Sequence, residues 1–134
     1  MAEKLLYVEI LTPGKNLFSG NVKKVSFPSA NGELGILPGH ASLLTMLGVG
    51  VVTCVDDKDR NRSFFCAGGF GQVLDDQVSL LADTAESSAE IDTERARKAR
   101  DRAEKRLHSG AADIDYLRAE ASLRRAMARL SVGS

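Results

Sequence analysis

Arginines recur at helical spacing near the end of the chain and present its clearest chemical pattern. Arg118, Arg125 and Arg129 are seven and four residues apart, so a helix would place them on one side, with Arg124 slightly round from them. Guanidinium groups bind phosphate and carboxylate through paired hydrogen bonds. The pattern indicates a face for an anionic ligand or an acidic protein partner, and the alternative is an ordinary solvated face. Nucleic acid fits poorly, because Tyr116 is the only aromatic residue of this region and acidic residues are interleaved.

A second candidate is the turn-rich segment from Asn31 to His40, Asn-Gly-Glu-Leu-Gly-Ile-Leu-Pro-Gly-His. It offers one carboxylate, one imidazole and several aliphatic side chains with few charges, which is typical of the core of a protein interface. We therefore consider it a docking edge. The alternative is a structured β-loop in which Leu34, Ile36 and Leu37 are buried.

Other motifs lack parts that their chemistry requires. The acidic loop 57–61 has the first spacings of a calcium loop, but Arg62 and Gly68 occupy the positions of its glycine and glutamate. The glycine-rich run 68–71 is followed by a strand pattern and not by a helix with Lys-Ser/Thr, so close strand packing or a bulge explains it better than a phosphate loop. The two histidines accompany no recognisable nucleophile signature. We expect no metal site and no catalytic activity of the chain alone.

Composition bounds the remaining classes. The chain has 134 residues and equal numbers of basic and acidic side chains, 18 of each, so no global field directs it to nucleic acid or anionic lipid. Its longest apolar run, Ala41 to Val55, is shorter than the roughly 20 residues of a membrane span. Cys54 and Cys66 are too few for a disulfide scaffold. We expect a soluble intracellular protein of one or two small domains.

Residues 1–86 predict a β-sandwich or barrel of seven or more short strands. Leu6, Val8 and Ile10 alternate with less apolar residues, and the continuous run Val49 to Val55 is typical of a strand buried on both faces. Gly68-Gly69 and Asp75-Asp76 are expected to separate further strands.

Residues 87–134 predict two helices in an antiparallel hairpin. Ser87 and Glu90 fit a capping box that would begin the first helix, and Gly110 suits the cap that ends it. Asp113 can cap the second helix. The predicted seam between the helices is mostly alanine, which forms helices readily but buries little area. The pair is therefore suited to movement, and a stable, unremarkable hairpin is the alternative.

Three segments resemble a known family. Gly32 to His40 (GELGILPGH) is similar to the signature loop of the epsilon subunit of bacterial and chloroplast F-type ATP synthases. Phe64 to Phe70 (FFCAGGF) resembles an aromatic and double-glycine strand of that family, and Arg118 to Leu130 resembles its last helix. The resemblance covers almost the whole chain in order.

The resemblance implies an α+β protein, with a ten-stranded β-sandwich at residues 1–86 and a helical hairpin at 87–134. It implies a non-catalytic subunit of the central rotor that joins gamma to the c ring, peripheral to the cytoplasmic face of the bacterial inner membrane and not inserted in it. Expected c-ring and gamma docking residues are Asn31, Gly32, Glu33, Leu34, His40, Ala41 and Ser42. An extended hairpin would block ATP hydrolysis by facing an acidic segment of a catalytic beta subunit, next to alpha, with Arg118, Arg124, Arg125 and Arg129.

A narrower resemblance concerns nucleotide. Some bacterial epsilon subunits bind ATP through an Ile/Leu-Asp-x-x-Arg-Ala motif, an upstream glutamate and arginines of the last helix. The matching residues here are Glu86, Ile91, Asp92, Arg95, Ala96, Arg125 and Arg129. ATP is thus a candidate regulatory ligand that would hold the hairpin folded, and no cofactor is required. Alternatively, Asp92 only favours the dipole of the first helical turn, with Arg95 as its partner.

The leading prediction is a coupling and regulatory subunit of a proton-translocating ATP synthase. The alternative is a free-standing nucleotide-sensing β-module with a helical tail.

Overall fold

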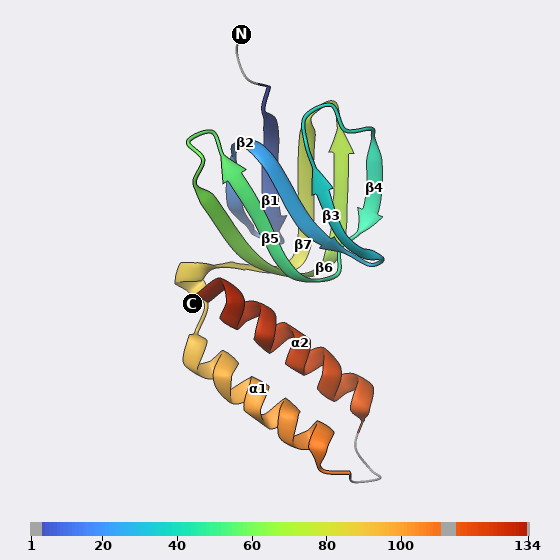
Figure 1. The fold of residues 1–134 in the computed structure, drawn as a ribbon, viewed down its shortest axis with the longest axis vertical. Helices are drawn as coiled ribbons and strands as arrows, with labels where there is room; N and C mark the ends of the chain where they lie inside the picture. Colours follow the sequence, from blue (N-terminus) through green and yellow to red (C-terminus); the bar gives the residue numbers. More distant parts are fainter. Residues whose placement is uncertain (1–3, 111–114, 134) are drawn as a thin grey trace.

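The computed structural model describes residues 4–110 and 115–133, which form a β-sandwich followed by two helices (Figure 1). The strands are β1 (Leu6–Thr12), β2 (Lys15–Ser29), β3 (Gly32–Ile36), β4 (Leu43–Met46), β5 (Val49–Asp56), β6 (Asn61–Leu74) and β7 (Gln77–Ser87). A short 3₁₀ turn, η1 (Ser88–Glu90), leads to the helices α1 (Thr93–His108) and α2 (Tyr116–Gly133). Neither described helix is long and apolar enough to cross a lipid bilayer.

The strands form one continuous sheet that folds back on itself. Its order is β1-β7-β6-β5-β2-β3, with β4 added to β6, and β1 also pairs with β2. β2 makes the return possible, because its first half pairs with β1 as far as Val22 and its second half pairs with β5 and β3. The pairings are antiparallel, except that β1 and β7 run parallel.

The resemblance implied ten strands, and the described residues form seven, a number within the range predicted from the residues. The difference arises from three long strands, β2, β6 and β7, of 15, 14 and 11 residues. β2 and β6 each change a partner along their length; β6, for example, pairs with β5 in its first half and with β4 in its second. β7 pairs with β6 throughout but with β1 only as far as Leu81. If each long strand is counted as two segments, the total is ten.

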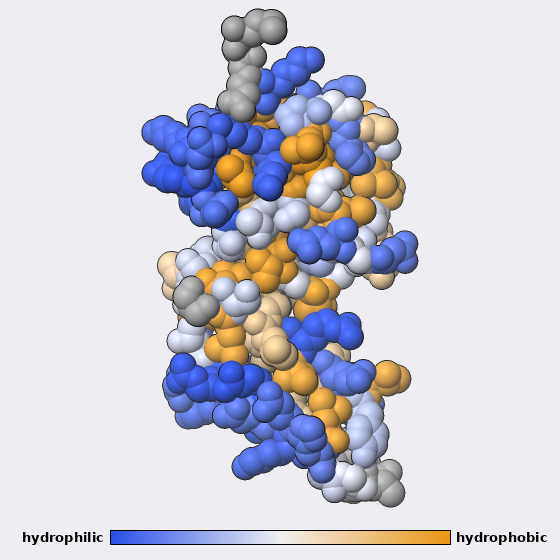
Figure 2. Space-filling model, viewed as in Figure 1, coloured by the Kyte–Doolittle hydropathy of each residue, from blue (hydrophilic) through white to orange (hydrophobic). Residues whose placement is uncertain are grey.

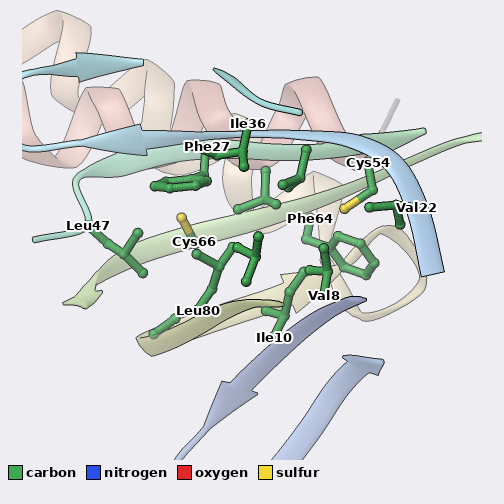
Figure 3. Close-up of a cluster of buried hydrophobic side chains, with 14 of the residues drawn as sticks. Val8, Ile10, Val22, Phe27, Ile36, Leu47, Cys54, Phe64, Cys66 and Leu80 are labelled. Atoms are coloured by element: carbon green, nitrogen blue, oxygen red, sulfur yellow. The ribbon is translucent and has the colours of Figure 1, made fainter. Parts of the chain in front are cut away.

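Side chains from the two layers meet in one apolar core (Figure 3). The alternation predicted for β1 is confirmed, since Leu6, Val8 and Ile10 are completely buried. Phe27 and Phe64 extend into the same core from β2 and β6. Full burial of a side chain of this size contributes about 1.5–3 kcal/mol.

The apolar run of β5 is covered on both faces, by different elements. Val52 and Cys54 face the sandwich core, whereas Val49 and Val51 pack on a second cluster formed by three buried residues. Those residues are Phe65 of β6, Ile91 of the linker and Val132 of α2. A helix, and not another strand, therefore covers the outer face of β5.

Both thiols lie inside this structure. Burial raises the pKa of Cys54 to about 12 and that of Cys66 to about 11. Because the thiolate is the reactive form, neither thiol reacts readily at neutral pH while the chain is folded. A cysteine introduced on the surface can therefore be labelled selectively.

Asp56 organises the polar loop that follows β5, which is the segment that lacked the glycine and glutamate of a calcium loop. The carboxylate of Asp56 accepts hydrogen bonds from the backbone N–H groups of Arg60 at 2.8 Å and Lys58 at 2.9 Å. These bonds, the one from Arg60 first, hold the pKa of Asp56 below its ordinary value of 3.8. Asp59, in a left-handed conformation, pairs with Lys23 at 2.7 Å.

The first helix begins later than predicted. The Glu90 carboxylate accepts hydrogen bonds from the N–H and hydroxyl of Ser87, but this arrangement closes only η1. α1 begins after Asp92, whose Oδ1 accepts from the Arg95 N–H at 3.0 Å. Asp115 caps α2 in the same way, whereas the predicted cap Asp113 lies outside the described residues.

Alanine forms the seam between the two helices, as predicted. The buried positions are Ala96 and Ala103 on α1 and Ala119 and Ala126 on α2. The contacts of the hairpin with the sandwich come from α2, which packs on β5 and β6. Hydrophilic side chains cover α1, and hydrophobic ones continue along α2 toward the sandwich (Figure 2). The mobility of the hairpin stays a prediction.

Gly68 and Gly69 do not end a strand, contrary to prediction. β6 continues through them, and its register with β7 is the same on both sides. Both glycines have positive φ, and a Cβ at Gly69 would lie 2.0 Å from the carbonyl oxygen of Leu81. Close strand packing thus explains this glycine pair, the interpretation that the sequence favoured over a phosphate loop.

We predict that Gly69→Ala lowers the free energy of unfolding by about 3 kcal/mol, because the added methyl meets backbone at a φ that alanine rarely adopts. Gly35→Ala is the matched control, since nothing lies within 4 Å of its Cβ position, and we expect a change below about 0.5 kcal/mol. Urea unfolding followed by circular dichroism measures both. Equal effects of the two substitutions would contradict this explanation.

Candidate functional site

A cavity of about 360 Å³ lies where the hairpin meets the end of the sandwich. Six of the seven residues predicted for ATP line it, drawn from β7, the linker, α1 and α2. These are Glu86, Asp92, Arg95, Ala96, Arg125 and Arg129. Its volume lies within the roughly 300–1,000 Å³ of small-molecule sites.

The seventh predicted residue, Ile91, lies beneath the cavity and is not part of its lining. Its side chain is buried and packs with Phe65 and Val132. Ile91 therefore fixes the linker on the sandwich directly before Asp92, which is where α1 begins.

The lining includes residues that sequence reasoning did not select. Arg102, Ser122, Glu90 and Ala99 also face the cavity. Helical spacing could have identified two of them, because Arg102 follows Arg95 by seven residues. Ser122 precedes Arg125 by three and accepts a hydrogen bond from its guanidinium at 3.3 Å.

The cavity combines four guanidinium groups with three carboxylates. The carboxylates of Glu86, Glu90 and Asp92 have partners within the structure: Glu90 pairs with Lys15 of β2, and Glu86 pairs with Arg129. Asp92 accepts the N-cap hydrogen bond of α1. Each carboxylate thus has a partner within the protein. The four guanidinium groups outnumber the three carboxylates, so the lining carries an excess of positive charge that suits an anion.

Arg129 lies between a carboxylate and an aromatic ring of the sandwich. Its Nε donates to Glu86 Oε1 at 2.6 Å, and its guanidinium lies 4.3 Å from the centre of the Phe65 ring. Glu86 and Phe65 belong to the sandwich, and Arg129 belongs to the hairpin. The same side chain therefore lines the cavity and joins the two parts of the molecule.

The four arginines predicted to form one face of α2 are divided. Arg125 and Arg129 are half-buried and line the cavity, whereas Arg118 and Arg124 are exposed outside it. Arg102 of α1 completes the basic lining in place of the two exposed arginines.

The predicted docking segment runs from the turn before β3 to the connection after it, which lie at opposite ends of that strand (Figure 1). Asn31, Gly32 and Glu33 are exposed in and after the turn from β2, where the Asn31 N–H donates to the Ser29 hydroxyl at 3.2 Å. Leu34 is half-buried against the core. The prediction that Leu37 is buried is wrong, because 60% of this residue is exposed after the end of β3.

The rest of that segment is the exposed connection from β3 to β4. His40, Ala41 and Ser42 are all exposed. The Nδ1 atom of His40 lies 2.7 Å from the carbonyl oxygen of Ala41, within hydrogen-bonding distance.

An apolar row, which the sequence analysis did not identify, crosses the outer face beside this segment. Met46 of β4, Phe70 of β6 and Leu81 of β7 are cross-strand partners in register. Their exposed fractions are 59%, 54% and 51%, and Leu44 on the same face of β4 reaches 72%. Hydrophobic side chains are visible at the β4 edge in Figure 2. Contiguous exposed apolar side chains of this kind mark interaction surfaces.

Comparison with known proteins agrees with this architecture. Residues 5–88 match the family described as ATP synthase, Delta/Epsilon chain, beta-sandwich domain, and residues 89–133 match its long alpha-helix domain. An ATP synthase epsilon chain of Desulforapulum autotrophicum is 44% identical, over 98% of this chain and 97% of that one. One of Moorella thermoacetica is 48% identical, over 93% of each chain.

A solved structure shares the fold at lower identity. A chain in the Euglena gracilis mitochondrial ATP synthase structure, comprising OSCP, F1 and the c-ring, has a TM-score of 0.79. The two sequences are 21% identical, and the match covers 95% of this chain and 79% of that one. Together with the family matches and the bacterial relatives, these findings show that the chain belongs to the delta/epsilon chain family of ATP synthases.

Proposed function

We propose that this chain, a non-catalytic epsilon-type subunit of the ATP synthase central stalk, couples gamma to the c ring and restrains ATP hydrolysis with its hairpin. The near-full-length epsilon-chain relatives support membership of the complex over a free-standing sensor. The observation that carries the regulatory part is the small contact between hairpin and sandwich, which centres on Arg129.

In this proposal the sandwich is the rotor-docking domain. Gamma covers the apolar row of Leu44, Met46, Phe70 and Leu81, because burial of such side chains stabilises association. The loops of the c ring meet the two exposed segments Asn31–Leu34 and His40–Ser42. The subunit then lies at the cytoplasmic face of the bacterial inner membrane without entering the bilayer.

The hairpin is the regulatory part. While it is docked, Arg125 and Arg129 line the cavity and are half-buried, whereas Arg118 and Arg124 are exposed. Release from the sandwich would present all four guanidinium groups to an acidic segment of a beta subunit in the catalytic head, next to alpha. Attraction between opposite charges at close range would then hold the hairpin in the blocking position.

ATP is the ligand that we propose for the cavity. Arg95, Arg102 and Arg125 can meet phosphates, and Ala96 leaves room for a flat base. Because the lining comes from both helices and from β7, a ligand there binds the docked state preferentially. ATP would therefore shift the population toward the docked, non-inhibiting state.

Removal of the hairpin tests its inhibitory role. We predict that an assembled synthase whose chain ends after Ser87 hydrolyses ATP about fivefold faster or more, within the range of ordinary regulatory coupling. The full-length chain carrying Arg97→Ala is the control, because Arg97 lies on the exposed side of α1 and pairs with Glu94. An unchanged hydrolysis rate in an intact, coupled complex would contradict the inhibitory role but not the coupling role.

Titration of the isolated full chain with ATP, with and without magnesium, tests the ligand by NMR. We expect amide shifts to cluster at Glu86, Asp92 to Ala96, Arg125 and Arg129. Arg125→Ala with Arg129→Ala should weaken binding at least about tenfold, since each loses a charge-assisted hydrogen bond worth about 1.5–3 kcal/mol. Arg97→Ala should leave binding unchanged. No shifts at millimolar ATP would overturn the proposal of nucleotide binding.

A further inference from the structure

Arg129 is held on two sides by the sandwich. Its Nε–H donates to Glu86 of β7 at 2.6 Å, and its guanidinium carbon lies over the Phe65 ring of β6, 4.3 Å from the ring centre. A guanidinium has five N–H donors in a planar fork. One donor is therefore engaged by Glu86, and the ring restrains the position of the guanidinium. The terminal amino groups keep their donors, in a side chain that lines the cavity.

Phe65 is a rigid support for this contact. It is completely buried and packs in one cluster with Ile91 and Val132. A cation over an aromatic face is stabilised by about 0.5–2 kcal/mol, more when it is partly desolvated. The ring therefore restrains a long, flexible side chain that would otherwise lose entropy when it binds a ligand.

Glu86 is poorly suited to contact an anion directly. Its carboxylate repels phosphate, and its Oε1 is already committed to Arg129. We propose that Glu86 and Phe65 are positioning residues: they form a socket in the sandwich that orients Arg129 toward a phosphate-bearing ligand in the cavity. This inference deepens the proposed nucleotide binding and assigns Glu86 a different role from direct contact with ATP.

The socket makes the sandwich part of the anion site. The helices alone supply Arg95, Arg102 and Arg125, but Arg129 meets Glu86 of β7 and Phe65 of β6 only while α2 is docked on the sandwich. Anion binding is therefore coupled to docking of the hairpin on the sandwich, and not merely to contact between the two helices. When the hairpin leaves the sandwich, Arg129 loses its contacts with Glu86 and Phe65 even though both helices remain folded.

A double-mutant cycle on the full chain tests this role, with ATP as the probe and calorimetry as the readout. We expect Glu86→Gln to weaken binding about tenfold in the wild-type background and less than about twofold in an Arg129→Ala background. Glu94→Gln, which removes the same charge from an exposed pair with Arg97, should change neither value. Equal losses in both backgrounds would mean that Glu86 contacts the ligand directly, and would overturn the inference.

The Arg129 side chain provides a readout that does not require ATP. In the free wild-type chain we expect a slowly exchanging Nε–H signal that is shifted by the Phe65 ring current. The signal should lose its protection in Glu86→Gln and its ring shift in Phe65→Leu, and should stay unchanged in Glu94→Gln.

An unperturbed signal in Glu86→Gln would overturn the socket even if ATP binds. A normal socket signal without ATP binding would instead refute the nucleotide proposal alone. Should Phe65→Leu fail to fold, Glu86→Gln decides the question, because Glu86 is a partly exposed residue at the surface of the sandwich.

Discussion

The contact of one guanidinium with a carboxylate and an aromatic ring joins the two parts of this protein. Arg129 of the hairpin meets Glu86 and Phe65 of the sandwich, and Val132 packs beside them in the same turn of α2. Together with the apolar cluster of Phe65, Ile91 and Val132, this contact holds α2 on the sandwich. The cavity and its basic lining lie beside these two sets of contacts.

This contact contributes only a modest free energy to the docking of the hairpin. The ion pair is partly exposed, with side-chain exposures of 31% and 28%, so its contribution must be reduced for solvent screening. Burial of Ile91 and Val132 adds about 1.5–3 kcal/mol for each side chain. The alanine seam adds little area, although both helices form readily by intrinsic propensity. A docked state held by a few kcal/mol can be shifted by a ligand or a partner, whereas the sandwich core cannot.

The spacing of apolar and turn residues in the sequence predicted those elements in which one face is buried and the other is exposed. The alternation in β1, the alanine seam and the turn at Asn31-Gly32 depend on neighbouring residues, so the sequence reveals them. It misplaced the start of α1, because the Ser87–Glu90 box closes a single turn before Ile91 enters the apolar cluster. It also treated Gly68-Gly69 as a strand boundary, since the close approach of Leu81 is a tertiary property.

The candidate site was predicted as a set of residues but not as a geometry. Resemblance identified six of the lining residues, whereas the roles of Arg102 and Phe65 depend on how α1, α2 and β6 meet. The apolar row of Met46, Phe70 and Leu81 was not visible in the sequence, because strands far apart in the chain bring these residues into register. Such cross-strand neighbours are set by topology and not by local spacing.

The central claim is that the hairpin leaves the sandwich as a unit when the contacts of α2 with β5 and β6 break. Hydrogen exchange of the isolated full chain, followed by mass spectrometry, tests it most directly. We expect amides of α1 and α2 to exchange together, far faster than those of β5 to β7, and to slow when ATP is added, because opening of the hairpin costs much less than global unfolding. Protection of the helices equal to that of the core strands, with or without ATP, would contradict a movable hairpin.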